Sequence, residues 1–204
     1  MLTIQSWVHL SPTGAYLEGK AIPLAESNDG LLKRLYRQYV GDYPKFFKMD
    51  PLCQLGFMAS ELLLQKTSDR FSPREDRAVI LFSQSGSFAS DSHYQQTIAD
   101  PNDYFPSPSV FVYTLANIVT GEIAIRNHYF GETSCYLLNR NEITTMVATV
   151  EDSFLDPQTR SALCGWVEYV DATRYETTLF LVGSAPCPGK PTWDQDTLHS
   201  LINF

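Results

Sequence analysis

Apolar residues recur at helical spacing in several segments of this chain. The clearest predicted helix begins at Asp50-Pro51, where an acidic N-cap is followed by proline at the first helical position. Its apolar stripe extends to about Lys66. Another helix is predicted after Asn139 or Asn141, either of which can cap it, with a stripe of 3.6-residue period from Ile143 to Val150.

A further helix is predicted between these two, from Thr114 to a residue before Gly131. Glu122 and Arg126 are four residues apart and are expected to form an ion pair on its outer face. The residues expected to face inward are Leu115, Ile118, Val119 and Ile123. The preceding segment, residues 100–109, is rich in proline and is predicted to be an irregular loop with aromatic anchors.

Short β-rich runs alternate with the predicted helices. Ala78–Phe82 is apolar throughout and precedes a small-residue loop, which indicates a buried strand, and Thr133–Leu138 is also strand-like. Residues 161–170 and 176–182 are joined by a segment too short for a parallel crossover, so an antiparallel hairpin is predicted. The fold class is therefore α/β, with a mixed sheet of about five strands flanked by helices.

The chain has no internal repeat, no low-complexity tract and no Gly/Ser linker. One continuous domain over residues 1–183 is the simplest interpretation. Residues 184–204 form a proline-containing tail, in which the stretch from Asp194 to Phe204 has the spacing of a short docking helix.

The composition and net charge of the chain exclude several classes of function. The chain has 204 residues, 44% hydrophobic and 19% charged, which suits a soluble domain with a sizeable core. Fifteen Lys and Arg against 23 Asp and Glu give a net charge of -8, which argues against nucleic acid as a partner. The opening MLTIQSWVHL lacks the features of a secretory signal, and no run approaches the ~18 apolar residues of a membrane span. A cytoplasmic protein without a membrane span is expected.

Motifs for catalysis or metal binding are weak. The four cysteines form no CxxC pair and have no histidine at zinc spacing, so no metal site or disulfide framework is predicted. The run Ser83–Ser87 follows a strand, as a nucleophile would, but lacks the Gly-x-Ser-x-Gly frame and the spacing of a P-loop. Cys135 lies within a strand, where a buried structural cysteine is favoured over a reactive one.

Aromatic residues concentrate in and after the predicted proline-rich loop. Phe105, Phe111 and Tyr113 are candidates for lining a small-molecule pocket, and ordinary core packing is the favoured alternative.

Three segments of the chain resemble the N-terminal half of β-ketoacyl synthases. KMDPLCQLG (48–56) resembles the helix start near their N-terminus, and AVILFSQSG (78–86) resembles the strand and Gly/Ser loop that follow. The most specific is FPSPSVFVYTLANIVTGEIAIR (105–126), in which a Pro-Ser loop leads into an Asn-x-x-x-Gly-x-x-Ala-Ile helix. The resemblance covers about residues 1–183 and implies a thiolase-like half-fold, one of the two similar halves of a complete synthase.

The resemblance implies that this chain lacks the catalytic groups of the family. The family's nucleophilic cysteine follows a strand at an elbow, and counting from Gly131 places that position at or beside Arg140, within Leu138–Glu142. The catalytic histidines belong to the second half, which has no counterpart here. We therefore expect a non-catalytic auxiliary subunit that needs no cofactor, as in short synthase-like proteins of aryl polyene and flexirubin-type pigment clusters.

The resemblance also implies partners. In the family's dimers the strand before the nucleophile pairs with its equivalent, so the expected interface is Thr133, Ser134, Cys135, Tyr136, Leu137 and Leu138. The expected partners are a second copy or a full-length ketosynthase. An acyl carrier protein is less favoured because carrier proteins are themselves acidic. In one alternative the C-terminal tail covers this edge, and in another the chain is a small acyl-transfer or thioester-processing enzyme that uses Cys135 or Ser85.

Overall fold

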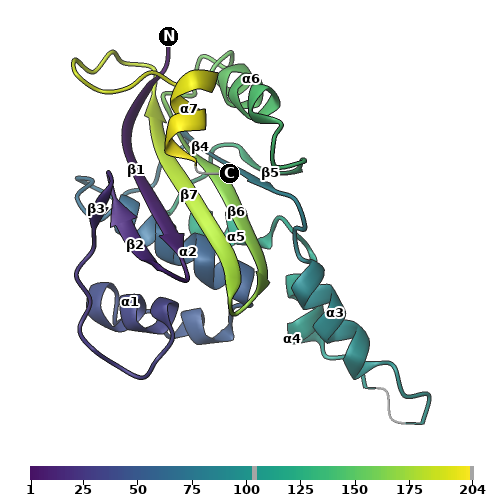
Figure 1. The fold of residues 1–204 in the computed structure, drawn as a ribbon. Helices are drawn as coiled ribbons and strands as arrows, with labels where there is room; N and C mark the ends of the chain where they lie inside the picture. The colour runs from purple at the N-terminus through teal and green to yellow at the C-terminus, as the bar shows by residue number, and fades with distance from the viewer. Residues whose placement is uncertain (103–104, 203–204) are drawn as a thin grey trace.

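The structure is a computed structural model that describes residues 1–102 and 105–202. Its centre is a seven-stranded sheet with the order β3-β2-β1-β7-β6-β4-β5 (Figure 1). The strands are β1 (Thr3–Ser11), β2 (Gly14–Leu17), β3 (Lys20–Ala21), β4 (Arg77–Ser83), β5 (Thr133–Leu137), β6 (Ser161–Asp171) and β7 (Arg174–Gly183). The α-helices are α1 (Leu31–Tyr39), α2 (Pro51–Leu63), α3 (Phe88–Thr97), α4 (Pro108–Phe111), α5 (Ile118–Asn127), α6 (Ile143–Ser153) and α7 (Gln195–Leu201). The described residues also form two short 3-10 helices, η1 (Pro44–Lys48) and η2 (Val112–Thr114).

The sheet is mixed, as predicted. Strand β4 is parallel to both β5 and β6, whereas β6 and β7 form the predicted antiparallel hairpin and β1 is antiparallel to β7. The sheet has more strands than the roughly five expected from the sequence, because β2 and β3 extend it beyond β1 as a small hairpin.

Helices cover both faces of the sheet. Helices α1, α2 and α5 lie on one face, where Leu55 and Ile123 share a core with Leu81 of β4 and Leu179 of β7. Helices α6 and α7 lie on the other face (Figure 1), where the buried residues include Ile80, Phe82, Met146, Trp166, Phe180 and Leu198. Strand β4 is buried along its whole length because both faces are covered, which explains the uninterrupted apolar run Ala78–Phe82 within it.

The helix predicted at Asp50-Pro51 is confirmed as α2. The Asp50 side chain accepts a hydrogen bond from the Cys53 backbone N–H (2.9 Å), and Pro51 occupies the first turn. This cap places Asp50 at the edge of the space between α2 and α3.

The helix predicted from Thr114 begins later than expected. Residues 108–111 form α4, η2 follows, and α5 starts only at Ile118. Leu115 therefore lies outside α5, and 52% of its surface is exposed, so its predicted inward orientation is wrong. Together α3, α4 and η2 form an arm that projects from the sheet (Figure 1).

The predicted outer ion pair between Glu122 and Arg126 is also wrong. Glu122 is buried, forms an ion pair with Lys45 (2.7 Å) and accepts a hydrogen bond from the Tyr113 hydroxyl (3.3 Å). Arg126 instead pairs with Glu61 of α2 (3.1 Å). Lys45 and Glu61 lie in η1 and α2, far from α5 in the sequence, so residue spacing within α5 gave no indication of these pairs.

The C-terminal segment packs against the start of the chain. The Ile4 N–H donates to the Pro191 carbonyl (2.9 Å), and the Trp193 N–H donates to the Leu2 carbonyl (3.0 Å). Helix α7 follows and buries Leu198 against the core beside α6. Of the predicted loop and tail, residues 103–104 and 203–204 lie outside the described residues. Among the described residues, no single helix is long and apolar enough to cross a bilayer.

Candidate functional site

Arg140 lies in the turn between β5 and α6, where the nucleophile position was predicted. Its guanidinium forms an ion pair with Glu176, which reaches it from β7 across β4 and β6. Burial raises the pKa of Glu176, and the charge of Arg140 opposes that rise without cancelling it. The elbow thus carries a cation that is paired with a half-buried carboxylate, and a guanidinium has no nucleophilic atom.

A second carboxylate, Glu168 of β6, holds the loop after β4. It accepts hydrogen bonds from the Ser83 hydroxyl (2.9 Å), from the Gln84 N–H (2.7 Å), and from both the N–H and the hydroxyl of Ser85. The Ser85 proton is therefore donated to a carboxylate and not to a histidine base. The Ser83–Ser87 run is therefore a structural loop that hydrogen bonds to the Glu168 carboxylate hold in place.

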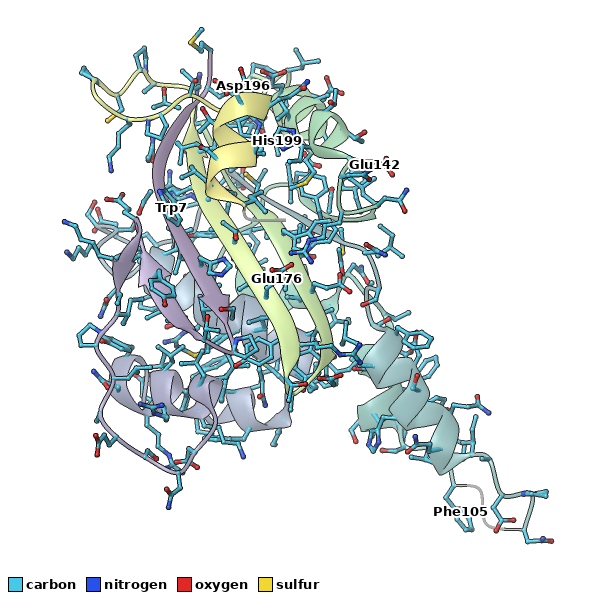
Figure 2. The ribbon with its side chains drawn as sticks, in the orientation of Figure 1. Trp7, Phe105, Glu142, Glu176, Asp196 and His199 are labelled. Carbon is cyan, nitrogen blue, oxygen red and sulfur yellow. The ribbon has the colours of Figure 1, made fainter. Side chains whose placement is uncertain are left out.

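Glu168 and Glu176 lie directly opposite each other on β6 and β7. They share a depression of about 400 Å³ with Arg140, Ser11 and Tyr175. Like charges in this position repel, and the charge of Glu168 contributes to the raised pKa of Glu176. Figure 2 shows Glu176 on the open lower part of the sheet face, below α7. The sequence analysis did not single out either glutamate. Glu168 follows Cys164 and Trp166 on one face of β6, and Glu176 precedes Thr178 and Phe180 on the same face of β7.

Cys135 lies on β5 opposite Leu81 of β4 and is partly buried. Burial raises the pKa of its thiol to about 11. A thiol with this pKa is protonated at neutral pH, which is the opposite of the shift that an activated cysteine needs.

The outer edge of β5 is open. In the described part of the chain, β5 pairs with β4 alone and ends the sheet. The tail pairs beside β1 instead, through Thr3 and Thr192, so the alternative in which it covers this edge is wrong. Of the six residues predicted as an interface, the two with large exposed side chains are Tyr136, 39% exposed, and Leu137, 60% exposed.

The arm begins beside this edge, at Gly86. Gly86, at the base of α3, has a left-handed φ of 55° and lies against Leu137 and Ala116, which leaves no room for a side chain. Exposed apolar side chains are also present on the arm, and we call these, together with the two on β5, the edge patch: Phe88, Phe111, Val112, Leu115, Tyr136 and Leu137.

The three aromatic residues predicted to line a pocket are not brought together. Phe105 is 83% exposed at the far end of the arm (Figure 2), and Phe111 is 50% exposed. Tyr113 alone lines a cavity, located between the arm and the start of α2. Neither a shared pocket nor core packing therefore describes Phe105 and Phe111.

No protein-family model and no curated protein matches the chain. Solved structures do match. The ishigamide ketosynthase/chain length factor is 18% identical with a TM-score of 0.70, and the match covers 94% of this chain and 64% of that one. The ketosynthase ApeO in complex with its chain length factor ApeC from Xenorhabdus doucetiae is 14% identical with a TM-score of 0.60, over 90% of this chain and 79% of that one.

A third match is a type II polyketide synthase acyl-carrier protein in complex with its ketosynthase bound to the hexaketide (AntDE:AntF), 8% identical with a TM-score of 0.59. It covers 90% of this chain and 58% of that one. The chain thus spans less than two thirds of the length of two of these three chains. At such identities the likeness concerns the fold. It confirms the thiolase-like half-fold expected from the sequence, since this protein shares its fold with the matched part of ketosynthase and chain length factor chains.

Proposed function

We propose that this chain is a non-catalytic, ketosynthase-like subunit that pairs with a complete ketosynthase in a bacterial type II fatty acid or polyketide system of the aryl polyene kind. The observation that carries the proposal is the open edge of β5 beside the exposed apolar residues of the edge patch. An unpaired edge with adjacent apolar surface favours pairing with another chain.

The backbone of β5 presents a defined set of groups for such pairing. The Val79 N–H donates to the Glu132 carbonyl (2.8 Å), and the Leu138 N–H donates to the Ser83 carbonyl (2.9 Å). Because alternate residues of a strand direct their backbone groups to the same side, Thr133, Cys135 and Leu137 direct theirs away from β4. These three residues supply the donors and acceptors for a partner strand.

A ketosynthase is favoured over a second copy as the partner. Two of the similar structures are described as a ketosynthase with a chain length factor, and the likeness of this chain to them supports the same kind of pairing. A homodimer is the competing outcome. An acyl carrier protein is less favoured, because the net charge of -8 repels an acidic partner at a distance.

The proposal that the chain is non-catalytic is supported by Arg140, which occupies the position expected for the nucleophile. Arg140 cannot form an acyl-enzyme bond, and its pairing with Glu176 gives it a structural role. Cys135, the nearest thiol in sequence, has a raised pKa and belongs to the predicted interface. The chain would thus contribute surface and stability to a partner that carries out the chemistry.

The test is co-expression of this chain with a complete ketosynthase encoded in the same gene cluster, followed by affinity purification and light scattering. A 1:1 complex is expected. Cys135→Pro removes an outward N–H at an edge position where proline is tolerated, and should abolish the complex, whereas the control Cys135→Val keeps the N–H and should retain it. A homodimer with no ketosynthase bound, or a complex unaffected by Cys135→Pro, would contradict the proposal.

A further inference from the structure

An open cavity of about 790 Å³ lies at the base of the arm, between α3, α4 and η2 on one side and the start of α2 on the other. We propose that it binds one small amphipathic molecule with an apolar body and a hydrogen-bond-donating end, such as an alkyl alcohol or a protonated alkyl amine. Its volume is within the range typical of small-molecule sites. The lining residues are Lys48, Met49, Asp50, Pro51, Ala89, Ser90, His93, Ser109, Val110, Tyr113 and Tyr169.

The walls suit an apolar body. Met49, Pro51 and Val110 contribute aliphatic surface, and Tyr113 and Tyr169 contribute aromatic rings from η2 and from the end of β6. Aromatic and aliphatic walls with a few polar groups are the usual composition of a ligand pocket. None of the residues of the edge patch lines this cavity, so a ligand here and a partner chain at β5 would use different surfaces.

Three polar groups in the wall act as acceptors: buried Ser90 and half-buried Asp50 and Tyr113. The Ser90 side chain is buried and its hydroxyl donates to Asp50 Oδ2, so its proton is already used. The Tyr113 hydroxyl donates to Glu122 in the same way (3.3 Å). Asp50 accepts from Ser90 and from the Cys53 N–H, and a carboxylate has about four acceptor sites, so it can accept further bonds. At the end of the cavity formed by Asp50, Ser90 and Tyr113, a ligand therefore meets lone pairs and has to supply the protons.

The charges around the cavity also favour a ligand that donates hydrogen bonds. Burial raises the pKa of Tyr113 and Tyr169, and the negative charge of Asp50 adds to both shifts, with Glu122 adding to that of Tyr113. Lys45 pairs with Glu122 and balances its charge. Lys48 and His93 also line the cavity, but both are exposed, so water screens them more than the half-buried Asp50. A carboxylate ligand would be repelled at the polar end of the site.

The inference is tested with three probes of equal chain length: octylamine, 1-octanol and octanoate. Each is titrated into the purified chain while the ring resonances of Tyr113 and Tyr169 are followed by NMR. Octylamine and 1-octanol are expected to shift these resonances saturably, with octanoate binding at least about tenfold weaker, which corresponds to about 1.4 kcal/mol. Equal or tighter binding of octanoate, or no saturable shift with any probe, would overturn the inference.

Matched variants locate the binding. Ala89→Trp fills the cavity, whereas Gln95→Trp places the same ring on an exposed position of α3 that does not line it. Octylamine affinity should fall at least about tenfold in the first variant and stay unchanged in the second. Val110→Trp fills the cavity from α4 and replaces Ala89→Trp if that variant does not fold. Equal affinity in filled and control variants would contradict the site. Because β5 is unchanged in all of them, ketosynthase pairing can be measured separately.

Discussion

The guanidinium of Arg140 and the carboxylate of Glu176 form an ion pair that joins the turn after β5 to strand β7, across two intervening strands. The turn occupies the position where a ketosynthase-like elbow was predicted. The pair holds this turn against the sheet while leaving the adjacent edge of β5 open.

Arg140→Met is expected to destabilise the protein in a pH-dependent way. Burial raises the pKa of Glu176, so the stability associated with this group is greatest below its usual pKa of 4.5 and is lost as the pH rises through the folded-state value. Without Arg140 the pKa of Glu176 rises further. Urea unfolding should show a loss of about 1–2 kcal/mol at pH 8 and little loss near pH 4.

The double variant Arg140→Met/Glu176→Gln is the control for this prediction. It removes the unpaired carboxylate, so most of the loss at pH 8 should be recovered. An equal loss at both pH values, or no recovery in the double variant, would show that Arg140 acts through some other contact.

Glu168→Gln is expected to release the loop after β4. The carboxylate accepts hydrogen bonds from the Ser83 hydroxyl and from the backbone N–H groups of Gln84 and Ser85. Losing this charged acceptor should cost about 1–3 kcal/mol. Hydrogen exchange should accelerate at the amides of Gln84 and Ser85, whereas the control Glu176→Gln should leave these two amides protected. If hydrogen exchange at these amides is unchanged in Glu168→Gln, the hydrogen bonds to Glu168 are not what orders the loop.

The elements that could be predicted from the sequence are those whose local pattern is unbroken. Strand β4 is apolar because it is buried on both faces, and the β6–β7 hairpin is fixed by its short connection. Strand β1 was not predicted. A register irregularity between Ile4 and Ser6 shifts its alternation, so the strand shows no single period-2 pattern.

The candidate site was predictable only in part. Arg140 could be placed at the elbow because the resemblance to β-ketoacyl synthases, counted from Gly131, implies that position. Its partner Glu176 is on another strand and carries no local signal. The environment of Glu122 was missed for the same reason. Its spacing to Arg126 suggested an ion pair on the surface. Lys45 and Tyr113, which approach it only in the folded chain, make it a buried group instead.

Glu61→Ala is expected to be among the most destabilising single substitutions. The Glu61 side chain is 4% exposed and pairs with both Arg70 and Arg126. Its removal leaves the largely buried guanidinium of Arg70 without a carboxylate and leaves Arg126 with only the exposed carboxylate of Asp42 (3.7 Å), which should cost about 3–5 kcal/mol. The control Asp29→Ala removes the partner of Arg37, whose side chain is 62% exposed, and should cost less than about 1 kcal/mol in the same urea titration. Similar losses in the two variants would contradict this account.

Alkylation with iodoacetamide distinguishes a structural Cys135 from a nucleophile. Cys187 is exposed and should react first, whereas Cys53 and Cys164 are buried and should react only on unfolding. Cys135, with its pKa raised to about 11 by burial, should react slowly at pH 7, and its rate should increase about tenfold per pH unit up to pH 10. Peptide mapping by mass spectrometry assigns the sites, with Cys135→Ala as the control. If Cys135 instead reacts rapidly at pH 7 with a rate that levels off below pH 8, its thiol is activated. The small acyl-transfer enzyme that uses Cys135 would then become the better account of this chain.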